Sequence, residues 1–266
     1  MKAKKIISIV MAVVMMLSVV FCAVPTVGAK STSSKKATLS LSDKFIALYT
    51  KGCDNTIVAY GSLVNKNLKW GQTNSKVLKL SKVYNKQKTC SRVNIKPIST
   101  GTTKVWCKNG KTTRYCTVTV KKSSKSEIAN FAYMFQNANL NYFLNYDTTN
   151  SFFSANWSAM FVSFVMKNVS KNSMSSPTVS SWVNDAKRQH RYHKITSKNK
   201  PHKGDLVVIS KSGYYSHIGI VHSVKGNNMT IVEGNVGSSN YINSYVGVHK
   251  YNIKSKIWTD FIDTKV

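Results

Sequence analysis

The spacing of apolar residues changes near residue 121, and this change limits the folds that the chain can adopt. Between residues 36 and 121, apolar and polar residues alternate in short runs such as Ala37–Leu41 and Tyr115–Val120. A period of two is typical of strands that bury one face. Asn109 and Gly110 separate two such runs and favour a tight hairpin turn. Roughly seven or eight short strands in this segment predict a small all-β sandwich.

The second half combines a helical period with later strands. Ser124 and Glu127 have the spacing of a capping box, which indicates a helix start. Apolar residues follow the i, i+3, i+4, i+7 pattern from Trp157 to Val165, and a shorter helix is expected over Val179–Gln189. Three strand-like runs follow: Asp205–Ile209, His217–Val224 and Met229–Glu233. Helices followed by an antiparallel sheet predict an α+β domain.

The N-terminal residues resemble a secretory signal. Three lysines within the first five residues precede an apolar run over residues 6–24, and Val27-Gly28-Ala29 suits cleavage after Ala29. A retained anchor is the alternative, because the run approaches the length of a membrane span. Pro25 and the small residues before the cleavage point favour cleavage. We therefore expect residues 1–29 to be a signal peptide and the mature protein to be exported, wall-associated and without a transmembrane segment.

The sequence is strongly basic, with 39 Lys and Arg against 9 Asp and Glu and a formal net charge of +30. Residues 30–125 contain 21 of the basic residues against only Asp43 and Asp54, a net charge of +19. This exceeds what solubility requires, and it attracts polyanions of any kind. Outside a cell these are wall teichoic acids, anionic lipid surfaces or extracellular DNA. We expect anionic wall polymers as partners, and no specific nucleic acid.

Cysteines occur only in the first half of the mature chain. They are Cys53, Cys90, Cys107 and Cys116. In an exported chain, four cysteines suggest one or two disulfides, with three possible full pairings. No Cys-x-x-Cys spacing occurs, so we expect no metal site, and we expect no cofactor.

The end of the first segment resembles a known module. Gly101-Thr-Thr-Lys-Val leads into one strand, and Val118-Thr-Val120 ends the next. This arrangement is similar to the last hairpin of bacterial immunoglobulin-like domains of group 2. The resemblance implies an immunoglobulin-like sandwich over residues 36–121, acting as a spacer or adhesive unit. A linker at residues 122–126 would join it to a second domain at residues 127–266.

Four short motifs in the second half occur in the order of one enzyme family. They are Asn156-Trp-Ser-Ala, Pro201-His-Lys-Gly-Asp-Leu, Ser216-His-Ile-Gly-Ile-Val and Thr230-Ile-Val-Glu-Gly-Asn235. Together they resemble the CHAP domain, a cysteine/histidine-dependent amidohydrolase/peptidase domain found in peptidoglycan-cleaving proteins. The resemblance implies a papain-like α+β fold and amidase or endopeptidase activity on peptidoglycan stem peptides.

The same resemblance assigns roles to four residues. Ser158 occupies the nucleophile position at a helix start, His217 is the base, Glu233 orients it and Asn235 is an auxiliary polar partner. A helix N-terminus favours a developing negative charge, and a histidine can take a proton and return it. If the turn near residues 225–228 has an odd number of residues, Asn235 falls opposite His217, with Glu233 on the same face.

Ser158 departs from the family pattern, which has cysteine at this position. A helix dipole and an imidazole can hold a thiol ionised, but they cannot do so for a hydroxyl. Misplacing a nucleophile by about an ångström costs roughly a hundredfold in rate. We therefore expect hydrolysis to be reduced or lost, which leaves a binding pseudoenzyme. A working serine hydrolase and a cationic surface adhesion protein are the alternatives, and an engineered knockout would carry the same sequence.

Other polar residues near these motifs have alternative explanations. Trp157, Tyr214 and Tyr215 are expected to line the cleft, although surface packing explains the two tyrosines equally well. Asp205 is expected to serve the Gly-Asp-Leu turn, and His222 is an alternative base that points to the opposite face. The remaining histidines lack metal-ligand spacing and are expected at the surface: His190, His193, His202 and His249.

Overall fold

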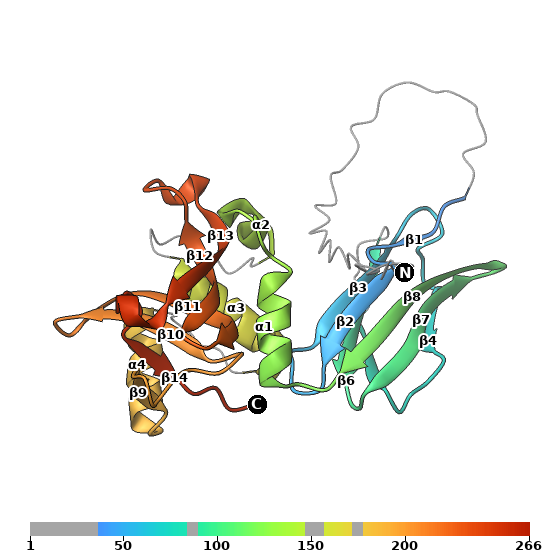
Figure 1. Cartoon of the computed structure of the whole chain (residues 1–266). Coiled ribbons are helices and arrows are strands. Elements are labelled where there is room, and N and C mark those ends of the chain that lie inside the picture. Colours follow the sequence, from blue (N-terminus) through green and yellow to red (C-terminus); the bar gives the residue numbers. More distant parts are fainter. Residues whose placement is uncertain (1–36, 84–89, 147–156, 172–177) are drawn as a thin grey trace, which may run out of the picture.

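The computed structural model describes residues 37–83, 90–146, 157–171 and 178–266. Residues 37–121 form two β-sheets, here called the first part, and residues 125–262 form helices and a third sheet, the second part. The two parts lie side by side (Figure 1). The signal peptide expected at residues 1–29 lies outside the described ranges. Within these ranges, no helix is both long enough and apolar enough to span a membrane.

The first part consists of two four-stranded sheets that enclose one core. One sheet has the order β1-β3-β6-β5, formed by Ser40–Leu41 (β1), Asn55–Tyr60 (β3), Cys90–Pro97 (β6) and Leu78–Val83 (β5). The other has the order β2-β8-β7-β4, formed by Phe45–Tyr49 (β2), Thr112–Lys121 (β8), Gly101–Asn109 (β7) and Lys69–Gln72 (β4). Alternate side chains of β7 and β8 are buried between the sheets, as the period of two predicts. The β7–β8 turn places Gly110 in a left-handed conformation, with φ of 55°.

Strand β2 is the strand of this part that alternation does not predict. It pairs parallel with β8, from Phe45 opposite Thr117 to Tyr49 opposite Lys121. Its sequence is apolar throughout. Its inward side chains join the core of the first part, whereas Tyr49 packs edge-on against Phe131 of the second part, with ring centroids 5.7 Å apart. Because both faces of its C-terminal end are covered, the strand does not alternate.

The second part places helices against a six-stranded antiparallel sheet, the α+β arrangement that the sequence predicted. The helices are Lys125–Tyr133 (α1), Leu140–Tyr146 (α2), Ser158–Ser170 (α3) and Val179–Arg188 (α4), with short 3-10 helices at Tyr241–Asn243 and Ile253–Ser255. The sheet has the order β13-β12-β11-β10-β14-β9. Its strands are Tyr192–Lys194 (β9), Leu206–Lys211 (β10), Tyr214–Lys225 (β11), Asn228–Val236 (β12), Tyr245–Asn252 (β13) and Asp260–Ile262 (β14).

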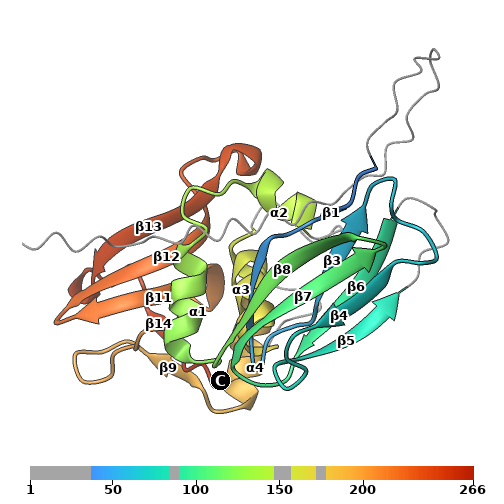
Figure 2. The same cartoon turned by 90° about the vertical axis from the view of Figure 1, so that its right-hand side faces the viewer.

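Helix α3 is buried over most of its length. It packs on β11 and β12 through residues such as Phe161 and Val165, which meet Ile220 and Val232 in the main core. It also contacts β2, so it lies between the sheet and the first part (Figure 2). The other face of the sheet carries a smaller core that includes Trp258. Both faces of the central strands are therefore covered.

Close packing joins the two parts near the connection between them. Helix α1 begins at Lys125, inside the linker expected at residues 122–126, and Ser124 Oγ accepts a hydrogen bond from Glu127 N at 3.2 Å. Ser123 Oγ accepts one from Lys51 N at 2.8 Å. A Cβ added at Gly52 would lie 2.0 Å from the carbonyl oxygen of Asn168 in α3. This contact leaves no space for a side chain at position 52.

The cysteines correct the expectation of disulfides. Cys53, Cys107 and Cys116 are thiols in the structure. Cys107 and Cys116 lie on adjacent strands but diagonally, because Cys107 is opposite Arg114 and Cys116 is opposite Val105. Diagonal neighbours are about 7–8 Å apart, beyond the usual Cα separation of a disulfide. Burial raises the pKa of Cys107 to about 11 and that of Cys116 to about 12, so both thiols stay protonated at neutral pH.

Candidate active site

Ser158 begins helix α3, at the position where the sequence predicts a nucleophile. The side chain is fully buried, and its Oγ has no hydrogen-bond partner among the residues that the structure describes. Trp157 is the N-cap residue and makes no side-chain cap. The first intrahelical hydrogen bond runs from Phe161 N to Trp157 O at 2.9 Å. The amide groups of the first turn therefore point from the helix without intrahelical acceptors, as at any helix N-terminus.

Three residues from later in the chain fix the start of α3. Trp157 Nε1 donates to Ser244 Oγ at 2.8 Å, and Ser244 Oγ donates to Asn235 Oδ1 at 2.9 Å. Gly234 lies directly under the helix, because a Cβ there would be 2.7 Å from Phe161 Cβ and from the Trp157 ring. The Glu-Gly-Asn motif thus places β12 against α3, and Asn235, with φ of 64°, leaves the strand path to meet Ser244. Trp157 is fully buried, so its ring supports the helix start and offers no exposed surface.

His217 and Glu233 are brought together as the sequence predicts. His217 Nε2 lies 2.9 Å from Glu233 Oε2. The other carboxylate oxygen, Oε1, accepts hydrogen bonds from His249 Nδ1 at 2.8 Å and Tyr251 Oη at 2.7 Å. Burial by itself raises the pKa of Glu233, but the hydrogen bonds from His217, His249 and Tyr251 outweigh it and hold this pKa below its ordinary value. Glu233 is therefore an ionised carboxylate that is hydrogen-bonded to His217.

The strand register that permits this contact depends on a bulge. The β11–β12 turn consists of Gly226 and Asn227, because Lys225 pairs with Asn228. A two-residue turn alone would put Glu233 on the opposite face from His217, because it shifts the register by one residue relative to an odd-length turn. A register shift between Val221 and Ser223 restores the required register, so that Ile220 pairs with Val232.

His222 is the residue left over at this bulge, and it does not reach the site. It lies against Tyr133 of α1, with ring centroids 4.6 Å apart. Burial, followed by the charge of Lys203, lowers the pKa of His222. Its side chain therefore packs against α1, which agrees with the expectation that it points away from His217.

Aromatic side chains pack on one side of His217. Trp258 packs beside the imidazole, with ring centroids 5.7 Å apart, and it lies at the same distance from Tyr251. The His217 side chain keeps 18% of its accessible surface, whereas that of Glu233 keeps 3%. The imidazole is thus partly accessible to solvent, whereas the carboxylate beside it is almost completely buried.

Ser158 and His217 share no hydrogen bond in this structure. The two halves of the predicted triad are therefore present as separate arrangements: Ser158 with the Trp157, Ser244 and Asn235 supports, and His217 with Glu233. Coupling of Ser158 to His217 stays a prediction. Among the described residues, no group of three or more His, Cys, Asp and Glu is arranged to hold a metal ion.

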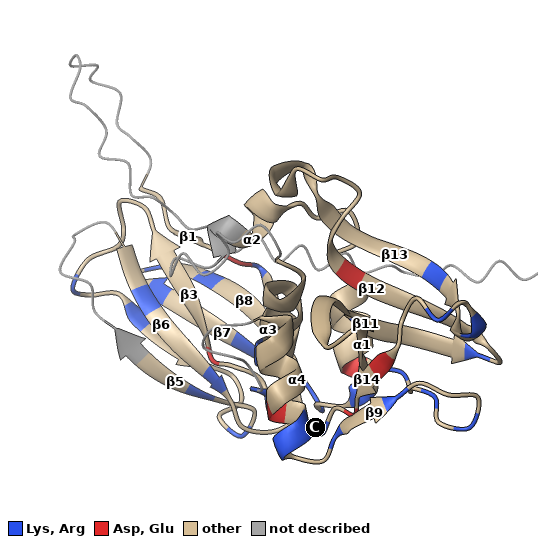
Figure 3. Cartoon of the chain, turned by 90° about the vertical axis from the view of Figure 1, so that its left-hand side faces the viewer, with Lys and Arg blue, Asp and Glu red and all other residues tan. Residues whose placement is uncertain are grey.

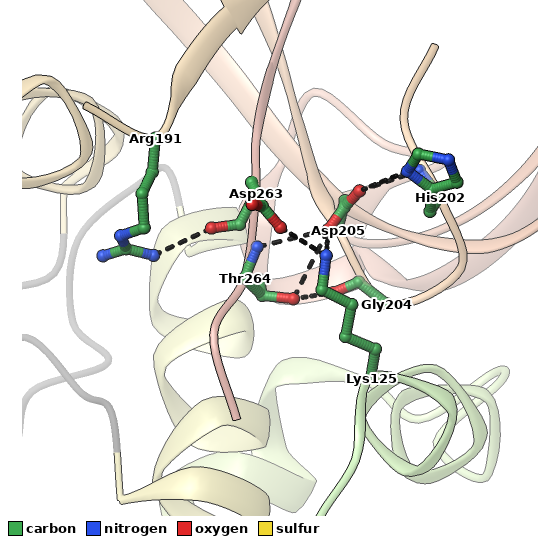
Figure 4. A network of polar contacts seen from close by, with 7 residues as sticks. All are labelled: Lys125, Arg191, His202, Gly204, Asp205, Asp263 and Thr264. Carbon is green, nitrogen blue, oxygen red and sulfur yellow. Dashed lines mark hydrogen bonds and ion pairs between the residues drawn. The ribbon is translucent and has the colours of Figure 1, made fainter. Parts of the chain in front are cut away.

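Asp205 serves the fold, as expected for the Gly-Asp-Leu turn (Figure 4). It is fully buried, and its carboxylate accepts hydrogen bonds from Lys125 Nζ at 2.8 Å and from His202 N at 2.8 Å. Thr264 N also donates to it at 3.2 Å, and Lys125 Nζ reaches Asp263 as well. Asp205 therefore joins the start of α1, its own turn and the segment after β14.

The predicted cleft tyrosines lie beyond the His217 cluster. The side chain of Tyr214 is 69% exposed. Tyr215 Oη accepts a hydrogen bond from Lys187 Nζ of α4 at 2.7 Å, and its ring lies edge-on to Tyr192. Neither tyrosine has a contact that ties it to Ser158, so their role in a cleft stays a prediction.

The residues of β13 that complete the cluster were not predicted from the sequence. His249 was expected at the surface, and its side chain is 42% exposed, but its hydrogen bond to Glu233 was not predicted. Tyr251 and Trp258 were also missed. Strand β13 was not predicted, although Tyr245, Gly247, His249 and Tyr251 alternate with other residues from Tyr245 to Asn252. That alternation was the available signal, because it places His249 and Tyr251 on one face.

A family model of the CHAP domain matches residues 70–235, which is more than half of the chain. The chain belongs to the CHAP domain family. The CHAP match contains Ser158, His217, Glu233 and Asn235. It begins within β4 of the first part and ends near the end of β12, so it is not confined to residues 127–266, where the sequence analysis placed the domain.

Other comparisons add little to the CHAP assignment. No curated protein matches the chain. The chain is similar to "Ly7917 with the hydrolyzing product of MDP", at 14% identity over 52% of this chain and 62% of that chain, with a TM-score of 0.35. It is also similar to the S-layer protein rSbsC(31-844), at 14% identity over 33% of this chain and 13% of that chain, with a TM-score of 0.28. The chain thus spans less than two thirds of either protein, and likenesses at such TM-scores carry no conclusion.

Proposed function

We propose that this CHAP protein is exported to the cell wall and holds peptidoglycan stem peptides at the site around Ser158, with hydrolysis reduced or lost. The observation that carries the proposal is the Ser158 hydroxyl, which is buried at the start of α3 without a hydrogen-bond partner among the described residues. A serine nucleophile needs a base within hydrogen-bond reach to take its proton. His217 Nε2 hydrogen-bonds Glu233, and neither imidazole nitrogen hydrogen-bonds the Ser158 hydroxyl.

The rest of the site suits a thiolate better than a hydroxyl. The first turn of α3 offers free amide groups to a negative charge, and Glu233 is kept ionised beside His217. An imidazolium at His217 would be stabilised by this carboxylate and would in turn stabilise a thiolate at position 158. A hydroxyl at the same place stays protonated until attack, so it gains nothing from either group before the reaction. The proposed loss of activity therefore rests on one atom, the Ser158 oxygen.

Replacing Ser158 by cysteine tests this proposal. Mature protein is incubated with purified peptidoglycan, and soluble fragments are identified by mass spectrometry. We expect no release by the natural sequence and release by Ser158→Cys, because a thiol here can ionise. Ser163→Cys is the matched control, since it adds a buried thiol about one and a half turns further along α3, away from the helix N-terminus. We expect it to be inactive.

Two results would contradict the proposal. Release by the natural protein that is lost in Ser158→Ala would show that serine is a working nucleophile. If Ser158→Cys is inactive and neither form binds stem peptides in an equilibrium binding assay, the site does not act on peptidoglycan at all. Activity that is lost again in Ser158→Cys/His217→Ala would support the assigned role of His217.

The charge of the first part supports a second candidate function. Residues 30–125, which include the first part and its flanking lysines, carry a net charge of +19. We propose that this part is an immunoglobulin-like module that attaches the protein to anionic wall polymers. In the alternative, a cationic surface adhesion protein, attachment is the whole function and the second part binds no stem peptide. The binding assay above separates the two.

A further inference from the structure

The first part has a groove that the site around Ser158 does not use. Its volume is about 510 Å³. It is lined by residues in or next to strands β1, β2 and β3 and by residues of the β7–β8 hairpin. Three aromatic residues, Phe45, Tyr60 and Tyr115, and three cationic residues, Lys44, Lys104 and Arg114, line it. None of its lining residues is acidic. The groove therefore combines flat apolar surfaces with positive charge.

The aromatic rings of the groove are unusually exposed for their size. Phe45 keeps 59% of its accessible surface, Tyr115 keeps 55% and Tyr60 keeps 37%. Phe45 is opposite Thr117 on β8, and Thr117 is opposite Lys104 on β7, so a ring, a hydroxyl and an ammonium group follow one another across the strands. An exposed aromatic face can stack on the C–H face of a sugar ring. Clustered exposed rings mark a binding surface more often than single ones do.

The cations of the groove are available to a ligand. Within the described residues, Lys44, Lys104 and Arg114 form no ion pair with a carboxylate. Asp43 lies next to Lys44 in sequence, but its carboxylate accepts a hydrogen bond from Ser42 Oγ at 2.6 Å and is not part of the lining. Lys and Arg residues occur on strands of both sheets of the first part (Figure 3). A phosphate group would meet favourable charge throughout this region.

We propose that this groove binds a glycan whose sugars are linked or substituted by phosphodiester groups. This proposal rests on the proposed function, because it requires that the protein is exported to a cell wall that contains such polymers. Ser40, Thr113 and Thr117 supply hydroxyls for sugar hydroxyl groups, whereas no Asn, Gln, Asp or Glu lines the groove. Amide and carboxylate side chains are those that pair with adenine and cytosine edges. The lining therefore lacks the groups that read adenine and cytosine edges, whereas its hydroxyls suit the hydroxyl groups of sugars.

Matched charge variants of the mature chain test the groove. The groove variant is Lys44→Gln/Lys104→Gln/Arg114→Gln. The control, Lys79→Gln/Lys96→Gln/Arg92→Gln, removes the same charges from exposed positions on the outer face of the other sheet. The probe is purified wall teichoic acid, titrated calorimetrically at about 0.15 M salt. We expect roughly a tenfold or greater loss of affinity for the groove variant and about a threefold loss at most for the control, because distant exposed charges are screened.

A second variant tests the aromatic residues of the groove without changing its charge. Phe45→Ser/Tyr115→Ser removes the two most exposed rings. We expect it to lower affinity by at least roughly tenfold, which is the loss expected when a single stacked ring is removed. Equal losses in the two charge variants with no loss in the aromatic variant would overturn the groove. Tighter, groove-dependent binding of a single-stranded oligonucleotide of equal charge would overturn the choice of ligand. Neither result bears on the binding of stem peptides at Ser158. An experiment that rules out the groove therefore does not rule out the proposed function.

Discussion

At the scale of single residues, Glu233 organises the His217 side of the site. Its two oxygens accept hydrogen bonds from two histidines and a tyrosine that come from β11 and β13. The side chain is almost completely buried, so an ionised carboxylate here depends on those donors. The same hydrogen bonds hold the Glu233 carboxylate in place beside the His217 ring.

The lowered pKa of Glu233 predicts a pH-dependent contribution to stability. Because the folded-state pKa lies below the ordinary value of 4.5, the contribution is present above pH 4.5 and is lost as pH falls through the folded-state pKa. Glu233→Gln should lower the free energy of unfolding by roughly 1–3 kcal/mol at pH 7. The difference from the natural protein should shrink below about pH 4.5. Urea denaturation between pH 7 and pH 3 measures it, with the exposed Asp54→Asn as control. A difference that is constant over this range would contradict the ionised state.

At the scale of elements, the buried Asp205 turn joins segments far apart in sequence. Lys125 at the start of α1 reaches both Asp205 and Asp263, which follows β14 (Figure 4). Arg191 adds a hydrogen bond to the carbonyl oxygen of Asp263 at 2.9 Å. The turn before β10 and the segment after β14 are thus tied to the start of α1 by charge.

Removing the Lys125 ammonium should destabilise this junction. Lys125→Met leaves the Asp205 carboxylate buried without its cationic partner. Breaking a buried ion pair costs about 3–5 kcal/mol, and because the Lys125 side chain is 35% exposed we expect a smaller loss of roughly 2–3 kcal/mol. Lys122→Met, an exposed lysine three residues earlier, should change the free energy of unfolding by less than about 0.5 kcal/mol. Equal effects of the two variants in chemical denaturation would show that the Asp205 contact does not stabilise the fold.

The elements also show what the sequence could predict. Period-two runs and helical spacing located most strands of the first part and helices α1, α3 and α4, because each buries one face. Strand β2 does not alternate, since the second part covers the end of its outer face. The contact between His217 and Glu233 depends on a bulge at His222, which no local pattern marks. The partners of Glu233 on β13 could not be paired with it from sequence, because strand order in a sheet is a tertiary property.

At the scale of the whole molecule, the first part packs directly against the helix that carries Ser158. Tyr49 contacts Phe131, and Cys53 Sγ donates a weak hydrogen bond to Asn168 Oδ1 at 3.5 Å. Ser123, in the short connection, is buried and accepts a hydrogen bond from Lys51 N. A wall-binding first part would therefore present α3 and its site at a fixed orientation to the polymer that it binds.

Gly52→Ala should loosen this arrangement without changing the core of either part. A Cβ at position 52 would lie 2.0 Å from the Asn168 carbonyl oxygen, a backbone atom that cannot move aside unless the two parts separate. Overpacking of this kind costs about 1–3 kcal/mol, which corresponds to roughly a 5–150-fold change in an opening equilibrium. Trypsin cleavage after Lys122 should accelerate accordingly, because Ser123 leaves its buried site when the parts separate. Gly110→Ala is the control: its added Cβ meets no atom within 4 Å, and its left-handed backbone is strained only locally. Equal cleavage rates in Gly52→Ala and the natural protein would mean that the two parts do not form a fixed unit.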